Sequence, residues 1–267
     1  MSALVRDEAR GVTIEAVVTG EGPDVILLAS ALRGAEDFAQ IQIKLARAGF
    51  RSLALNMRGV GQGEGPPGDF TLRDITDDIA GVIAELCQGP AHVVGHALGN
   101  ILARATASYR PEMVRTVTVM PCGGHNLATF PVSDHVLHHF ARCHQPNLSE
   151  EARRESLSIA FFALGNDPGS WLEGWWPEAS GIGTAAFEAD PETWWHAGDK
   201  PMLILHPLED AMAPPAQGQA AKEAFGERAQ YIEIHRCGHA ILPEQPEFVA
   251  NAIVKFLRAR FDTAGFV

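Results

Sequence analysis

The chain has 267 residues, 46% of them hydrophobic and 20% charged, which suits one large domain, or a domain with an insertion, around a sizeable core. Its formal net charge of −12 argues against nucleic acid and anionic membrane surfaces as partners. The N-terminus lacks the apolar run of a signal peptide, no stretch approaches the length of a membrane span, and four cysteines without a CxxC pair indicate free thiols in a reducing compartment, by default the cytoplasm.

The first half of the chain alternates between short apolar runs and stretches with helical spacing. After an N-terminal strand pair around 12–19, strands are expected at 25–28, 52–55, 92–94 and 114–120, and helices at 35–49, 72–87 and 100–109. The run at 25–28 is continuous, which is typical of a strand buried on both faces. This pattern predicts an α/β fold with a mostly parallel sheet, right-handed crossovers and helices on both faces.

The alternation breaks after Pro121 and returns at Met202. Between them, residues 124–198 hold two helical stretches, about 132–143 and 149–164, and a Trp-rich segment. The chain then ends with a strand at 202–205, a helix at 216–225, a strand at 231–234 and a helix at 245–260. We therefore predict that 124–198 is an insertion that forms a helical cap over the carboxyl edge of the sheet, where ligands bind in open α/β sheets.

Five residues, Gly95-His96-Ala97-Leu98-Gly99, join the 92–94 strand to the helix that follows. A strand, a sharp turn with flanking glycines and a helix make the geometry of a nucleophile elbow, whose G-x-S-x-G motif lifts one side chain above the sheet. The middle residue here is Ala97, which has no nucleophilic atom. The sequence thus describes a hydrolase whose nucleophile is missing.

Two later loops carry residue types that would complete a catalytic triad. Asp210 follows the 202–205 strand, where an acid can orient a histidine and stabilise its imidazolium. Glu209 is the alternative acid, and an acid there can also simply begin the next helix. His239 lies beside a glycine after the last strand, where it can act first as general base and then as acid.

The loop at 29–34, after the first buried strand, is the candidate for an oxyanion hole. We predict that the backbone N–H groups of Ala31 and Leu98 face the substrate oxygen, with Leu32 as the alternative to Ala31. The competing interpretation is an ordinary strand–helix loop.

Together these stretches resemble the α/β-hydrolase superfamily over nearly the whole chain. The matching pieces are the 29–34 loop, Asn56-Met57-Arg58-Gly59-Val60-Gly61 (similar to the family's D-x-R-G-x-G), the elbow, the Asp210 loop and Gly238-His239. The resemblance implies an α/β-hydrolase core at 1–123 and 199–267 with a helical cap at 124–198, and it implies no cofactor and no metal. Two positions depart from the family pattern: Ala29-Ser30 replaces the usual His-Gly, and Ala97 replaces the elbow serine.

The resemblance implies hydrolysis of a small to medium hydrophobic carboxylic ester or lactone, with serine at position 97 in the parent enzyme. His96 before the elbow residue fits the serine branch rather than the branch with Asp at the elbow. Since Asp210 and His239 are retained, an engineered Ser→Ala variant is favoured over a natural pseudo-enzyme that only binds a ligand. A small-molecule substrate is the expected partner, and homo-oligomerisation is left open.

One further enzymatic alternative is a carbon–carbon bond hydrolase that acts on ring-cleavage products with the same residues. Its dicarboxylate substrate would require a basic group in the pocket, and the options are Arg33, Arg58 and Arg142.

Other residues of the elbow region and the insertion are candidates for substrate contacts. These are Leu32, His96, Trp175 and Trp176, with Phe130, Phe161 and Phe162 as weaker candidates. The tryptophans of the insertion can equally pack the cap onto the sheet. His135, His139 and Cys143 have the i, i+4, i+8 spacing of zinc ligands, but without an H-E-x-x-H motif we interpret them as the polar face of a cap helix.

Overall fold

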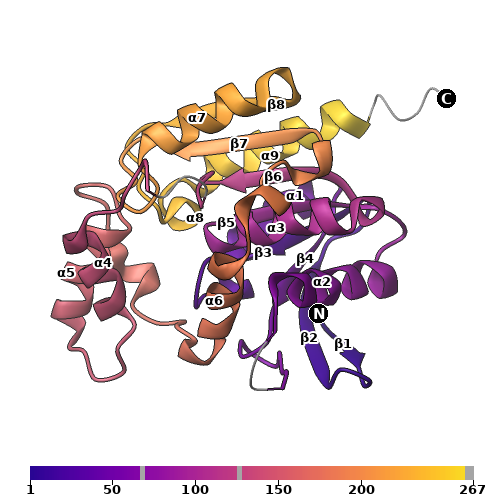
Figure 1. The fold of residues 1–267 in the computed structure, drawn as a ribbon, viewed down its shortest axis with the longest axis horizontal. Helices are drawn as coiled ribbons and strands as arrows, with labels where there is room; N and C mark the ends of the chain where they lie inside the picture. Colours follow the sequence, from indigo (N-terminus) through magenta and orange to yellow (C-terminus); the bar gives the residue numbers. More distant parts are fainter. Residues whose placement is uncertain (67–69, 125–127, 262–267) are drawn as a thin grey trace.

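The structure, a computed structural model, describes residues 1–66, 70–124 and 128–261. Residues 125–127 of the predicted cap, and 67–69 and 262–267 of the predicted core, lie outside the described residues. The described chain forms an eight-stranded sheet with strand order β1-β2-β4-β3-β5-β6-β7-β8 (Figure 1). The strands are β1 (Ser2–Asp7), β2 (Val12–Thr19), β3 (Asp24–Leu28), β4 (Arg51–Asn56), β5 (Ala91–His96), β6 (Val114–Met120), β7 (Met202–Pro207) and β8 (Ala229–Ile234).

The sheet is mostly parallel, as predicted. Strands β3 to β8 pair in parallel, whereas β2 pairs antiparallel with both β1 and β4. The N-terminal strand pair is therefore β1 with β2. The turn after Thr19 connects β2 to β3, but these two strands are not neighbours in the sheet. The α/β-hydrolase fold predicted from the sequence is confirmed.

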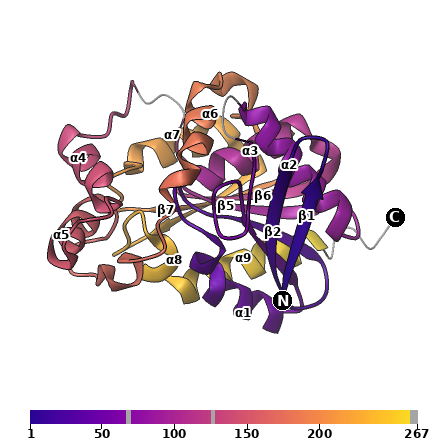
Figure 2. The same ribbon diagram turned by 90° about the horizontal axis from the view of Figure 1, so that it is seen from below.

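Helices cover both faces of the sheet (Figure 2). Helices α1 (Ala39–Arg47) and α9 (Pro246–Phe261) lie on one face, and α2 (Leu72–Leu86), α3 (Leu98–Tyr109) and α7 (Pro215–Phe225) lie on the other. Because successive side chains of a strand point to opposite faces, Val25 and Leu27 join the core under α1 and α9, and Ile26 and Leu28 join the core under α2 and α3. This two-sided burial explains the continuous apolar run at 25–28.

Between β6 and β7 the chain forms α4 (Asp134–Cys143), α5 (Glu150–Ala160) and α6 (Ser180–Glu188). In Figure 1, α4 and α5 lie on the side toward which the arrowheads of β6 and β7 point. The helix predicted at 149–164 ends early, because the Phe161 carbonyl accepts a hydrogen bond from the Ala240 N–H at 2.9 Å instead of continuing the helix. None of the described helices is both long enough and apolar enough to cross a membrane.

Candidate active site

The turn between β5 and α3 consists of Ala97 alone. Its backbone has φ 50° and ψ −110°, a conformation that costs a residue with a Cβ about 1–3 kcal/mol. Its N–H donates to the Met120 carbonyl at 2.9 Å, and its carbonyl accepts from the backbone N–H and the side-chain amide of Asn100 at 2.9 and 2.8 Å. These three hydrogen bonds hold the strained turn in place, with the Ala97 methyl group at the position predicted for the nucleophile.

The two glycines of the elbow allow close approach of neighbouring backbone. A Cβ on Gly95 would lie 2.0 Å from the Gly99 carbonyl oxygen, and a Cβ on Gly99 would lie 2.1 Å from the Leu28 carbonyl oxygen. Backbone atoms cannot move aside as a flexible side chain can. Both glycines are therefore required by space, which explains the G-x-x-x-G spacing found in the sequence.

We expect Gly99→Ala to lower the free energy of unfolding by about 3 kcal/mol or more, because the new methyl group would overlap backbone between β3 and α3. Gly81→Ala is the matched control: Gly81 lies inside α2 with open space around its Cβ position, so the change should be neutral or stabilise by up to about 1 kcal/mol. Urea unfolding measures both. Equal stabilities of the two variants would contradict the close packing of the elbow.

Asp210 and His239 form a buried pair. The His239 Nδ1 lies 3.0 Å from Asp210 Oδ1 and 2.9 Å from Oδ2. Asp210 Oδ1 also accepts the backbone N–H groups of Met212 and Ala213 at 2.8 and 2.7 Å, which fixes the carboxylate. Glu209, the alternative acid, is exposed and does not contact the imidazole through any hydrogen bond found among the described residues.

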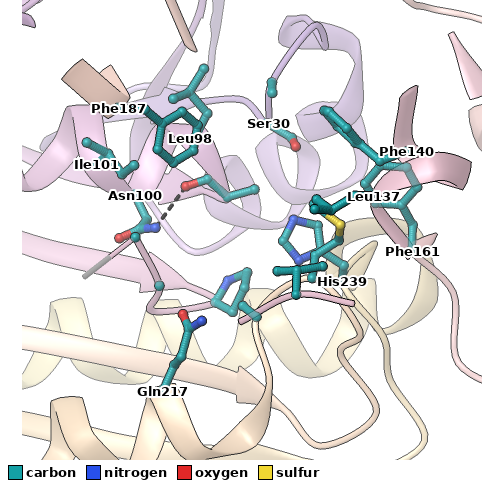
Figure 3. Close-up of a pocket in the computed structure, with 18 residues that line it drawn as sticks. Ser30, Leu98, Asn100, Ile101, Leu137, Phe140, Phe161, Phe187, Gln217 and His239 are labelled. Atoms are coloured by element: carbon teal, nitrogen blue, oxygen red, sulfur yellow. Dashed lines mark hydrogen bonds between the residues drawn. The ribbon is translucent and has the colours of Figure 1, made fainter. Parts of the chain in front are cut away.

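A cavity of about 250 Å³ brings these elements together (Figure 3). Ala97 and His239 both line it. Its apolar wall includes Leu98, Ile101, Leu137, Phe140, Phe161 and Phe187. The polar side chains of this lining are those of Ser30, Asn100, Gln217 and His239, and among the described residues that line it there is no Asp, Glu, Lys or Arg. The cavity therefore suits an apolar ligand with few polar groups.

The predicted oxyanion donors lie at the same cavity. Ala31 and Leu98 line it, whereas Leu32 does not. Leu98 is the first residue of α3, so its N–H has no intrahelical acceptor, and neither it nor the Ala31 N–H reaches another carbonyl within the part of the chain that the structure describes. Ala31 and Leu98 therefore stay the predicted donors to a developing oxyanion.

None of the four residues predicted to contact substrate belongs to the lining of this cavity. The residues are Leu32, His96, Trp175 and Trp176. His96 is fully buried, with its Nε2 2.8 Å from the His239 carbonyl oxygen. Trp175 Nε1 donates to the Trp171 carbonyl at 2.7 Å, and the Trp176 N–H donates to the Leu32 carbonyl at 2.9 Å. The backbone hydrogen bond from Trp176 to Leu32 joins the insertion to the 29–34 loop.

Aromatic packing also accounts for the other residues of the insertion. The Arg33 guanidinium lies 4.9 Å from the ring centroids of both Trp171 and Trp175, so the cation holds the insertion against the core. Of the weaker candidates, Phe161 lines the cavity, and Phe130 and Phe162 do not. His139 Nδ1 lies 3.1 Å from Ser156 Oγ, and no group of three or more metal-ligating side chains occurs in the described ranges.

Several residues of the cavity were not predicted from the sequence. Ser30 and Asn100 stand beside the motifs that it identified, so their proximity was an available signal. Leu137, Phe140, Phe187 and Gln217 carry no such signal, because which side of a cap helix or of α7 faces the site depends on how that helix docks.

Two buried histidines make stability depend on pH. Burial lowers the pKa of His92 to about 4 and that of His96 to about 3, from about 6.5 in the unfolded chain. The folded state favours the neutral imidazoles, whereas the unfolded chain binds a proton on each below about pH 6.5. The folded state is therefore most stable above pH 6.5 and loses stability as the pH falls toward 4. We expect each histidine to remove about 2 kcal/mol of stability between pH 7 and pH 5. In urea unfolding, the free energy of unfolding of His92→Phe should fall between pH 7 and pH 5 by about 2 kcal/mol less than that of the chain with His92. An equal fall in both proteins would contradict the lowered pKa of His92.

Comparison with known proteins places the chain among hydrolases. The profile of the Alpha/beta hydrolase family matches residues 25–252. The chain is 27% identical over 220 residues to the protein BpoC of Mycobacterium tuberculosis, covering 78% of this chain and 83% of BpoC. It is 30% identical over 109 residues to the 2-(acetamidomethylene)succinate hydrolase of Mesorhizobium japonicum, covering 41% of this chain and 39% of that protein. The esterase EaEST of Exiguobacterium antarcticum has the same fold, with a TM-score of 0.80 and 16% identity over 97% of this chain and 100% of EaEST.

Proposed function

The chain belongs to the alpha/beta hydrolase family, and on that premise we propose that it carries the machinery of a serine-type hydrolase for small to medium hydrophobic carboxylic esters or lactones, with Ala97 at the position of the nucleophile. One observation supports this most: His239 with its Asp210 partner, the positive-φ elbow residue, and Ala31 and Leu98, whose N–H groups reach no carbonyl among the described residues, all belong to one apolar cavity or its immediate support.

With serine at position 97, the reaction would follow from the geometry. The serine hydroxyl would attack the substrate carbonyl, and His239 would take its proton while Asp210 holds the imidazole. The N–H groups of Ala31 and Leu98 would stabilise the oxyanion. His239 would then give the proton to the leaving alcohol, and water would release the acid from the acyl-enzyme. With alanine, the covalent route is missing while the cavity is intact. We therefore propose that alanine replaced an ancestral or engineered serine.

We propose that the insertion at 124–198 acts as the cap of this site. Val132, Leu137, Phe140, Phe161 and Phe187 belong to the insertion and form much of the apolar wall. A cap of this kind would select substrates by the shape and apolarity of the acyl or alcohol group, and it would exclude bulk water from the acyl-enzyme.

The carbon–carbon bond hydrolase is the weaker candidate, because its dicarboxylate substrate needs a cation in the cavity. Arg33 pairs with Asp37, Arg58 with Asp78, and Arg142 with Glu155. None of these arginines lines the cavity. The relative named for 2-(acetamidomethylene)succinate shares part of the chain, but the described lining offers no cation for such a dianion.

The test is hydrolysis of nitrophenyl esters and lactones by the Ala97→Ser variant beside the chain with Ala97. A gain of activity that His239→Ala removes again supports the hydrolase. Ligand binding without any gain of activity supports the other candidate, a non-catalytic binding protein.

A further inference from the structure

We propose that Gln217 is a specificity-determining residue, which accepts a hydrogen bond from a hydroxyl or N–H group on the substrate. The proposal rests on the proposed function, since it concerns the same cavity. Its basis is a single atom: the Gln217 side-chain oxygen is buried, belongs to a residue that lines the cavity, and has no hydrogen-bond partner among the residues that the structure describes.

The orientation of the Gln217 amide follows from its other end. Its Nε2 donates to the Phe130 carbonyl oxygen at 3.2 Å. Because a carbonyl accepts and cannot donate, this bond fixes the nitrogen on the Phe130 side and leaves Oε1 as the free end. A flip of the amide would bring two acceptors together.

The free oxygen lies at the cavity wall. The Gln217 residue is only 4% exposed. Gly123 also lines the cavity, and a Cβ added to it would lie 2.8 Å from Gln217 Oε1. Figure 3 shows Gln217 reaching toward the cavity from the side opposite Ser30. Because Gly123 has no side chain, no Cβ fills the space beside this buried oxygen.

An unpaired buried acceptor is costly, so its presence favours a ligand that supplies the missing donor. Among the other polar side chains of the described lining, Asn100 resembles it, because Asn100 Oδ1 is also buried without a hydrogen-bond partner among the described residues, whereas Ser30 and His239 differ. The Ser30 hydroxyl both donates and accepts, and the His239 imidazole lies at the reacting end of the cavity. Gln217 Oε1 can only accept. It therefore discriminates a substrate that carries a hydroxyl or N–H from one that carries an ether oxygen or hydrogen at the same place.

The experiment measures dissociation constants by calorimetry with the chain as it exists, in which the missing nucleophile prevents turnover. The probes are the three ring isomers of methyl hydroxybenzoate and the three matching methyl methoxybenzoates, because the isomers place the donor at different depths. We expect at least one hydroxy isomer to bind on the order of tenfold more tightly than its methoxy partner.

Two variants separate recognition from folding. Gln217→Met removes the acceptor at similar size and should abolish the hydroxy preference without weakening binding of the methoxy ester. Gln219→Met, two residues along α7 at an exposed position, is the matched control and should leave the preference unchanged.

A hydroxy preference that is absent for all three isomers, or that persists in Gln217→Met, would overturn the inference. The proposed function is tested separately by turnover in Ala97→Ser. If that variant hydrolyses hydroxy and methoxy esters equally well, the hydrolase proposal stands and the role of Gln217 falls. If that variant hydrolyses neither ester while the binding preference is present, the role of Gln217 stands and the hydrolase proposal falls.

Discussion

Replacing Ala97 with serine should raise the rate of ester hydrolysis by about four to six orders of magnitude. Loss of a triad nucleophile typically costs on the order of 10⁴–10⁶ in kcat, and the proposed machinery lacks only the nucleophile. The elbow already holds position 97 at φ 50°, and the His239–Asp210 pair is already formed. The substitution adds one oxygen to a residue whose backbone three hydrogen bonds hold, so little reorganisation is needed. The measurement is kcat and kcat/KM on nitrophenyl esters of increasing acyl length.

The control for this variant is a hydroxyl placed elsewhere in the same cavity. Ala213 also lines the cavity but lies in the loop after β7, away from the elbow. Ala213→Ser should therefore give no activity. His239→Ala combined with Ala97→Ser should return the rate to that of the chain with Ala97. Activity of Ala213→Ser equal to that of Ala97→Ser would contradict the elbow assignment.

Asp210→Asn, made in the Ala97→Ser background, should lower kcat on the order of 10⁴-fold with little change in KM. The structure gives the reason. Oδ1 accepts two backbone N–H groups, so the amide oxygen of asparagine would take that place and its NH₂ would take the place of Oδ2, 2.9 Å from His239 Nδ1. A donor facing Nδ1 favours the tautomer with its proton on Nε2, which cannot accept a proton from the nucleophile.

The matched control for Asp210→Asn is Glu209→Gln, which removes the exposed neighbouring acid. Its kinetics should stay within about twofold of those of Ala97→Ser alone, because exposed charges are screened by solvent. Comparable losses in the two variants would indicate a long-range charge effect and would contradict a specific hydrogen bond between Asp210 and His239.

Local patterns were enough to predict most of the fold. A strand buried on both faces, such as β3, needs a continuous apolar run. The elbow needs glycine at positions 95 and 99, because a Cβ at either position would lie 2.0–2.1 Å from a backbone carbonyl oxygen. Such requirements involve neighbours in sequence or adjacent strands, so they leave a signature in the chain. The early end of α5 left none, because it depends on Ala240, which is remote in sequence.

The candidate site was predictable only in part, for the same reason. Asp210 and His239 stand at strand ends, and parallel strands bring their carboxyl ends to one edge, so their meeting followed from topology. The cavity wall depends on how the insertion docks. Trp175 and Trp176 were predicted as substrate contacts because they are large and apolar, but the Arg33 guanidinium lies over the Trp175 ring and the Trp176 backbone N–H binds the Leu32 carbonyl. Side-chain type alone does not decide between a ligand and a neighbour within the chain.

The most direct test of the central claim, that position 97 is a nucleophile position served by His239 and Asp210, is covalent labelling of Ala97→Ser with an alkyl fluorophosphonate. Intact mass and peptide mapping report the result. The account predicts one adduct per chain, located at position 97, no adduct on the chain with Ala97, and labelling that His239→Ala suppresses. An Ala97→Ser protein that is folded but takes up no label, or takes it up at another residue, would contradict the account.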